Sequence, residues 1–283
     1  MRTYSGIYIL PFFLVTLLFS GCNQNGKNVS ENDIKFNTIH VEKTYHLLEN
    51  PENPNCNLQV KFIYPEKYTD AAVLSKIQKW FIYTYFGDQY QELPPQDAVN
   101  QYVEDYLRNY KSLEEDFRSE LKFSGESPVG AWFSYYEMSS NEIMYNKGDL
   151  LSYTITYESY TGGAHGAHST INEVLDLKNG EPVTEEDLFI DNYQDRLAEI
   201  LVDQIAKQNQ VSDPKELENM GFFSIEEIYP NGNFVVDDSG ITYDFNEYEI
   251  AAYVVGTIHV PLPYTTIRHL LKNNSPISHL IDN

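Results

Sequence analysis

The stretch LLSYTITYESYTGGAHGAHSTINEVLDL, residues 150–177, contains two β-strand patterns separated by glycines. Apolar and polar residues alternate at both ends, and β-branched and aromatic residues, which favour strands, are frequent there. Glycines occupy positions 162, 163 and 166 between these ends. We therefore predict adjacent strands at 150–160 and 168–177, joined by a glycine-rich loop.

The segments before this stretch predict further strands and two long helices. Strands are expected at 36–48, 57–64 and 131–145, and the turn NKGD, residues 146–149, should place Gly148 at positive φ. Apolar residues recur at helical spacing from Val73 to Tyr85, and Gly87 closes that run. A second apolar stripe predicts a helix from Pro95 to Phe117.

The C-terminal part repeats this mixture of helices and strands. TEEDLF, residues 184–189, predicts a capped helix start, and 191–208 a third long helix. Short strands follow near 234–236, 241–245 and 252–260, and a short helix begins at Pro263. The fold class is α+β: mostly antiparallel sheet, two long helices in the N-terminal half, and one long helix plus a short terminal helix in the C-terminal half.

The N-terminus has the pattern of a bacterial lipoprotein signal. Arg2 precedes an apolar run at 7–19, which is too short to span a membrane comfortably, and LLFSGC ends at Cys22. We predict a signal peptide at 1–21 and lipid on Cys22. The polar residues that follow predict a flexible tether at 22–36. The expected location is the cell envelope, on the periplasmic face or outer surface, with the outer membrane favoured where one exists.

Charge and cysteine content limit the partners and the chemistry. The formal net charge of −23 repels phosphate backbones, so we expect no nucleic-acid partner. The same charge could steer a basic protein towards the chain, although acidic surfaces often serve only solubility. Once Cys22 is lipidated, Cys56 is the one remaining cysteine and has no disulfide partner within the chain.

The loop YTGGAHGAHS, residues 160–169, allows several interpretations. A tight structural turn is preferred, because Gly162 and Gly163 permit unusual backbone angles and His165 can bind nearby backbone. The loop, from Tyr160 to His168, could also form the rim of a binding groove.

Metal binding and catalysis by the same loop are weaker alternatives. His165 and His168 would share a face only on a helix, which the glycines oppose, and a third ligand such as His259 or Asp176 would be needed. Ser169 lies near these histidines, but no Gly-x-Ser-x-Gly motif is present. We therefore assign no catalytic residue, metal or cofactor.

Three motifs together resemble a known extracellular domain. YTGGAHG (160–166) is followed by LDLKNGEPVTEEDLF (175–189) and by GITYDFNEYEIAAYVVGTIHVPLPYTTIRHLL (240–271). This pattern resembles the domain shared by RsiV-type anti-sigma factors and PdaC-type peptidoglycan deacetylases, and found in many bacterial lipoproteins. The resemblance covers about residues 40–272 and is carried by Tyr160–His165, Asp176, Gly180, Asp187–Phe189, Phe245, Tyr248, Tyr253, Gly256, Pro263 and Tyr264.

The resemblance implies an N-terminal subdomain at 37–172, a C-terminal subdomain at 173–272 and a tail at 273–283. In RsiV-type proteins the domain binds lysozyme, and in PdaC-type enzymes a separate domain performs deacetylation. We expect this chain to be the bare module on a lipid anchor. Its expected function is non-catalytic binding or sensing of a lysozyme-like protein or of peptidoglycan; the alternative is an envelope hydrolase or metal-dependent enzyme using His165 and His168.

Overall fold

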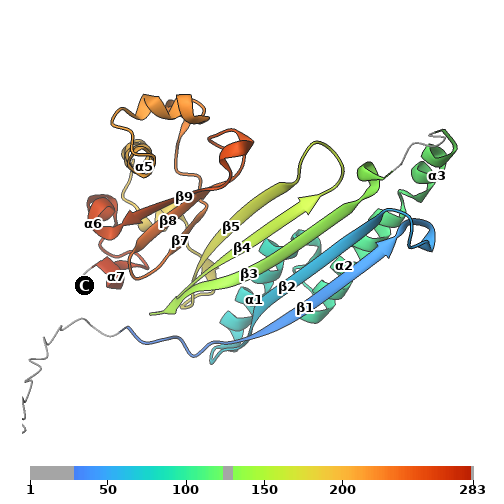
Figure 1. Ribbon diagram of the computed structural model, residues 1–283. Coiled ribbons are helices and arrows are strands. Elements are labelled where there is room, and N and C mark those ends of the chain that lie inside the picture. The colour runs from blue at the N-terminus through green and yellow to red at the C-terminus, as the bar shows by residue number, and fades with distance from the viewer. Residues whose placement is uncertain (1–28, 124–129, 282–283) are drawn as a thin grey trace, which may run out of the picture.

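The computed structural model describes residues 29–123 and 130–281, which form two β-sheets with helices packed on them. Figure 1 shows the long strands of the first sheet with α1 and α2 behind them, and the smaller second sheet beside one end. The predicted α+β class is confirmed, including the long helices in each half. Short 3₁₀ helices lie at Leu47–Glu49, Asp88–Tyr90, Ala131–Phe133, Pro214–Met220, Ile225–Glu227, Tyr253–Val255 and Arg268–Leu270.

The first sheet has its strands in sequence order. Neighbours pair antiparallel except β2 and β3, which run parallel. Parallel strands need a long crossover, and here that crossover carries the helices that cover one face. The strands are β1 (Lys35–His46), β2 (Asn55–Lys67), β3 (Tyr135–Lys147), β4 (Leu150–Tyr160), β5 (Ala167–Asp176) and β6 (Glu181–Pro182).

Helices α1 (Ala71–Phe86) and α2 (Pro95–Lys111) cover one face of this sheet. The Asp70 carboxylate caps α1 by accepting from the N–H groups of Ala72 and Val73. Alternate strand residues are buried beneath the helices, and Tyr153 of β4 stacks on Phe81 with ring centroids 3.9 Å apart. The opposite face of the sheet, hereafter the open face, therefore carries the other half of the alternating side chains.

The predicted helix from Pro95 to Phe117 is divided in the structure. Helix α2 ends at Lys111, and α3 (Glu114–Phe123) begins after Ser112 and Leu113. The break allows Phe117 to pack with Tyr110 in a separate buried cluster at the end of the sheet. The apolar positions were predicted correctly, but their spacing alone did not show that the chain changes direction between α2 and α3.

The second sheet has one apolar face and one polar face. Strands β7 (Phe234–Val236), β8 (Gly240–Phe245) and β9 (Ile258–Pro263) pair antiparallel. One face contributes to a core shared with α5 (Gln194–Gln208). The other faces one end of the open face, where Ser152 Oγ donates to Val236 O at 3.0 Å. The remaining helices are α4 (Glu185–Leu188), α6 (Tyr264–Ile267) and α7 (Ser278–Ile281).

The ordered fold begins earlier than the predicted tether allows. Ile34 is buried, and the Asn32 side chain donates to Asn146 Oδ1 at 3.0 Å and to Leu150 O at 2.8 Å. The segment 29–36 is therefore fixed to the β3–β4 hairpin, where Gly148 has the predicted positive φ of 62°. The predicted subdomain boundary at 172/173 lies within β5, whose residues enter both large cores, and that division stays a prediction.

Candidate functional site

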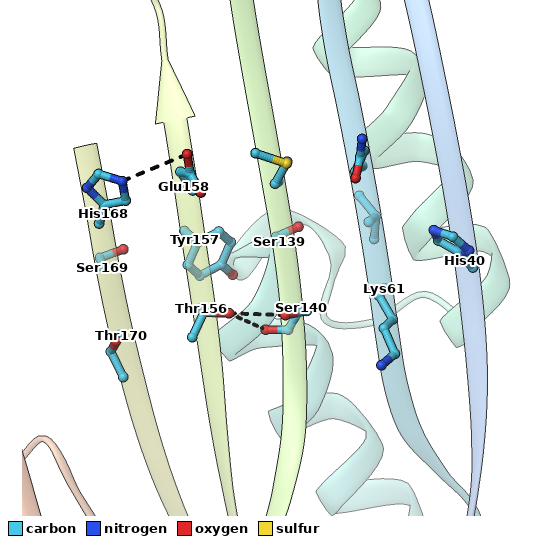
Figure 2. A pocket seen from close by; sticks show the side chains of 13 residues that line it. His40, Lys61, Ser139, Ser140, Thr156, Tyr157, Glu158, His168, Ser169 and Thr170 are labelled. Atoms are coloured by element: carbon cyan, nitrogen blue, oxygen red, sulfur yellow. Dashed lines mark hydrogen bonds and ion pairs between the residues drawn. The ribbon is translucent and has the colours of Figure 1, made fainter. Parts of the chain in front are cut away.

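A polar groove crosses the middle of the open face and has a volume of about 490 Å³. It exists because each strand alternates, so every second residue points away from α1 and α2. Figure 2 shows the side chains from β1 to β5 that line it. The lining residues are His40, Gln59, Val60, Lys61, Met138, Ser139, Ser140, Thr156, Tyr157, Glu158, His168, Ser169 and Thr170. Among them, the side chains of Val60, Ser139 and Tyr157 lie on the helix-covered side of the sheet.

A second cavity, hereafter the seam, lies where the open face meets the second sheet. Its volume is about 320 Å³. It shares Ser140, Thr156 and Thr170 with the groove, so the two cavities adjoin. The other lining residues are Asn141, Glu142, Met144, Thr154, Val235, Asp237, Thr242, Asp244 and His259.

Uncharged hydrogen-bonding groups dominate the middle of this surface. Ser140 Oγ and Thr156 Oγ1 lie 3.1 Å apart on neighbouring strands, and Figure 2 shows both at the centre of the groove. Hydroxyl groups both donate and accept, so they can bind ligand hydroxyls or amides in more than one orientation. Lys61 and Glu158 place opposite charges on the same surface.

The glycine loop adopts the predicted tight turn at the end of β4. Gly162 and Gly163 have φ of 83° and 119°, so both occupy the region that side chains disfavour. The Tyr160 hydroxyl donates to Gly163 O at 2.9 Å and closes the turn. The prediction that these glycines serve backbone geometry is confirmed.

His165 is fixed by aromatic side chains of the second sheet's loop. Its ring stacks on Tyr253 with centroids 3.9 Å apart, and Nδ1 lies 2.7 Å from Gly166 O. Because a carbonyl only accepts, Nδ1 is the donor, which confirms the predicted backbone hydrogen bond. The Tyr248 hydroxyl lies 3.2 Å from Nε2. Both ring nitrogens of His165 thus have protein partners.

His168 lies on β5 and points into the groove (Figure 2). Its Nδ1 is 2.8 Å from Glu247 Oε1, and Nε2 is 3.8 Å from Glu158 Oε1. The two loop histidines are therefore held by different partners. Across residues 29–123 and 130–281, no group of three or more His, Cys, Asp or Glu side chains is placed to hold a metal ion.

Side chains from the loops beside the second sheet cover the edge of β5. Backbone N–H groups of His168, Thr170 and Asn172 donate to Glu247, Asn246 and Asn233 at 3.2, 2.7 and 2.7 Å. Such capping satisfies an otherwise open strand edge. It also fixes the loops that carry Tyr248 and Tyr253 against the rim of the groove.

We expect Gly162→Ala to destabilise the fold more than Gly163→Ala. Positive φ costs alanine about 1–2 kcal/mol at either position. A Cβ on Gly162 would also lie 2.8 Å from Trp132 O, whereas a Cβ on Gly163 would meet nothing within 4 Å. Overpacking of this kind adds about 1–3 kcal/mol. Urea unfolding of both variants measures the difference, and equal losses would exclude the contact with Trp132 as a cause.

The sequence did not predict that His259 pairs with Asp244. It suggested His259 only as a third metal ligand beside His165 and His168. His259 Nδ1 lies 2.6 Å from Asp244 Oδ1, and both residues line the seam. The pairing depends on the register of β8 and β9, in which these residues are directly opposite. The alternation in ITYDF and IHVPL gave the faces of the strands but not their register.

Two half-buried carboxyl groups lie on the helix-covered side. Burial raises the pKa of Glu173 from 4.5 to about 7, although Trp80 Nε1, which donates at 2.8 Å, opposes this shift. Burial also raises the pKa of Glu137, which accepts a hydrogen bond from Tyr102. These groups lie outside the groove, and they affect stability rather than the candidate site.

Two family models match successive parts of the chain. Residues 51–168 match the family model described as deacetylase PdaC, and residues 186–265 match the model for a protein of unknown function, DUF3298. A crystal structure of a DUF3298 family member from Bacteroides fragilis is 33% identical, with a TM-score of 0.84. The match covers 89% of this chain and 99% of that one. This chain belongs to the DUF3298 family. The family expected from the three motifs is thereby confirmed.

A more distant DUF3298 structure, from Pseudomonas aeruginosa, shares the fold at 12% identity. Its TM-score is 0.57, and the match covers 86% of this chain and 97% of that one. None of the curated proteins compared with this DUF3298 chain matches it. The predicted signal peptide and Cys22 lie outside the described residues. Among the helices that are described, none combines the length and apolar character needed to cross a membrane.

Proposed function

We propose that this DUF3298 protein is a non-catalytic, lipid-anchored envelope protein. Its groove and seam bind a glycan chain, and the ligand is peptidoglycan. The observation that carries the proposal is the pair of adjoining cavities on the open face, about 490 and 320 Å³. An open surface of this kind suits an extended ligand, which can lie across several strands.

The chemistry of the lining supports a sugar ligand. Serine and threonine hydroxyls at Ser140, Thr156 and Thr170 occupy the region shared by both cavities. Sugars present many hydroxyl and amide groups, each of which must find a partner when water is displaced. Uncharged groups that both donate and accept meet that demand without the desolvation cost of burying charges.

The first loop histidine supports binding better than catalysis. His165 stacks on Tyr253 and has protein partners at both ring nitrogens, so neither nitrogen is available to a reacting proton, as a general base requires. His168 is paired with Glu247 through Nδ1, and its Nε2, 3.8 Å from Glu158 Oε1, is left for a ligand in the groove. We infer that the loop positions the rim of the groove, and we assign it no step in a reaction.

Ser140→Trp should abolish glycan binding while leaving the fold intact. Ser140 is half-buried and lines both cavities, so an indole there would fill the region that they share. Co-sedimentation with purified insoluble peptidoglycan, using the chain from residue 23 onward, measures the effect. Ser119→Trp on the exposed side of α3 is the matched control. Equal sedimentation of both variants would contradict the groove as the binding site.

A basic envelope-active protein such as lysozyme is the second candidate, because the net charge is −23. Opposite charges raise association rates, and salt screens that benefit. Exposed Trp132 and Tyr248 could supply aromatic anchors. Calorimetry against lysozyme at low and physiological salt tests this candidate. No heat at either salt concentration would exclude lysozyme, and equal affinity at both would remove the role of charge.

Cys22→Ala should leave the protein without its lipid. The proposal places the thioether-linked lipid on that cysteine, so no other residue should take up the label. Metabolic labelling with palmitate, followed by purification of the full chain and of the variant, measures lipidation. Label that persists in Cys22→Ala would contradict the anchor.

A further inference from the structure

The strands β8 and β9 place an imidazole and a carboxyl group side by side on the face that forms the seam. Asp244 and His259 are directly opposite in the antiparallel register. Residues of β8 two positions apart share a face, so Thr242 lies on the same side as Asp244. Tyr243, which lies between them in sequence, points to the opposite face and is buried in the core that this sheet shares with α5.

Asp244 holds His259 in one orientation. The Asp244 side chain is 7% exposed, and its carboxyl group has a partner on each oxygen. Oδ1 lies 2.6 Å from His259 Nδ1, and Oδ2 accepts from Asn172 Nδ2 at 2.8 Å. Asn172 Oδ1 in turn accepts from Thr154 Oγ1 at 2.7 Å. This chain of hydrogen bonds connects the imidazole to β5 and β4, so its position is fixed before any ligand arrives.

The geometry determines what His259 offers to a ligand. A carboxylate only accepts, so Nδ1 of His259 carries the proton and donates to Asp244. In the neutral ring the other nitrogen, Nε2, is then an acceptor. No hydrogen bond to Nε2 comes from any residue that the structure describes. The side chain is 62% exposed, and the residue lines the seam.

The rest of the seam selects against negative charge. Glu142 and Asp237 line it together with Asp244, whereas its lining includes no lysine or arginine among the described residues. Hydroxyls of Thr154, Thr156, Thr170 and Thr242 supply uncharged partners, and Met144 and Val235 supply apolar surface. An uncharged ligand with both hydroxyl groups and an apolar face fits this mixture, whereas an anionic group would be repelled.

We propose that the seam is a subsite for one uncharged sugar residue, in which His259 Nε2 accepts a hydrogen bond from a ligand hydroxyl and the seam carboxylates exclude anionic substituents. The subsite rests on the proposed glycan-binding function and makes that function specific for an uncharged sugar residue. The His259–Asp244 pair is fixed by a buried network although the imidazole is mostly exposed, an arrangement that suits recognition of a ligand.

Titration calorimetry with a neutral β-1,4-linked N-acetylglucosamine tetramer tests the subsite, again with the chain from residue 23 onward. His259→Ala should weaken binding about tenfold, the effect of one lost hydrogen bond to a desolvated ligand group. His269→Ala, an exposed histidine on the surface near α6, is the matched control and should bind as the unmodified chain does. The ¹⁵N resonance of His259 Nε2 should also move during the titration, which a merely structural role would not cause.

A sugar tetramer that carries carboxylates tests whether the seam carboxylates exclude anionic substituents. It should bind at least about tenfold more weakly than the neutral tetramer, and Glu142→Gln should recover part of the difference. Glu120→Gln on α3 controls for the general negative charge of the surface.

The outcomes separate the two proposals. Binding that is lost in Ser140→Trp but unchanged in His259→Ala would overturn the subsite and leave the groove as the binding site. Equal recovery in Glu142→Gln and Glu120→Gln would overturn exclusion by the seam carboxylates. Absence of tetramer binding to the unmodified chain would contradict both the glycan function and the subsite.

Discussion

Asp244→Asn is expected to lower the free energy of unfolding by about 2–4 kcal/mol, because the buried carboxyl accepts two hydrogen bonds that an amide cannot both receive. An asparagine has one accepting oxygen, so either its NH₂ group faces the Asn172 donor or His259 must move its proton from Nδ1 to Nε2, and both charge-assisted hydrogen bonds are lost. A buried donor without an acceptor carries its full desolvation cost. Urea unfolding, followed by tryptophan fluorescence, measures the change.

His259→Ala is the control for this result. Its side chain is 62% exposed, so its removal opens Asp244 Oδ1 to water, which replaces the lost partner, and should cost less than about 1 kcal/mol. A large loss in Asp244→Asn with a small loss in His259→Ala would show that the carboxyl supports the fold and positions the imidazole. A loss below about 0.5 kcal/mol in Asp244→Asn would contradict the buried network.

Glu173→Gln is expected to remove a pH dependence of stability. Burial raises the Glu173 pKa from 4.5 to about 7, so folding favours the neutral carboxyl. The associated stability is fully present below pH 4.5 and is lost as the pH rises through about 7. The loss approaches about 3 kcal/mol above that range. Glutamine stays uncharged and keeps an oxygen for the Trp80 N–H, so the variant should be the more stable protein at pH 8.

Unfolding of Glu173→Gln and the unmodified chain between pH 4.5 and 8 measures this effect. Glu137, whose pKa is also raised by burial, is present in both proteins, so the difference between the two curves isolates Glu173. The two proteins should have similar stability near pH 4.5 and diverge as the pH increases. Parallel curves across the whole range would show that Glu173 is not neutralised by burial.

The sequence predicted helices and strands well where side-chain alternation and glycine positions determine them. Strands β4 and β5 and the loop between them follow from alternation and from the backbone freedom of Gly162 and Gly163. The end of α2 was not predicted, because Phe117 continues the apolar stripe of α2 although it packs on a different cluster. Periodicity reports which residues are apolar, but tertiary packing determines where the chain turns.

The candidate site was predicted only at its rim. The sequence directed attention to His165 and His168, yet His165 packs on Tyr253, and His168 is the member that enters the groove. The pairing of His259 with Asp244 required the register of two strands, which short strands do not reveal by composition. The open face required knowledge of which face α1 and α2 cover, and that is set by long-range packing.

Amide chemical-shift mapping of the chain from residue 23 onward, titrated with the N-acetylglucosamine tetramer, tests most directly whether the groove and seam are the ligand site. We expect saturable shifts centred on Ser140, Thr156 and Thr170, the residues common to both cavities, and extending to His259. The amides of α1 and α2, on the covered face of the sheet, should not respond. Shifts centred on those helices, or no shifts at saturating tetramer, would contradict the groove and seam as the ligand site.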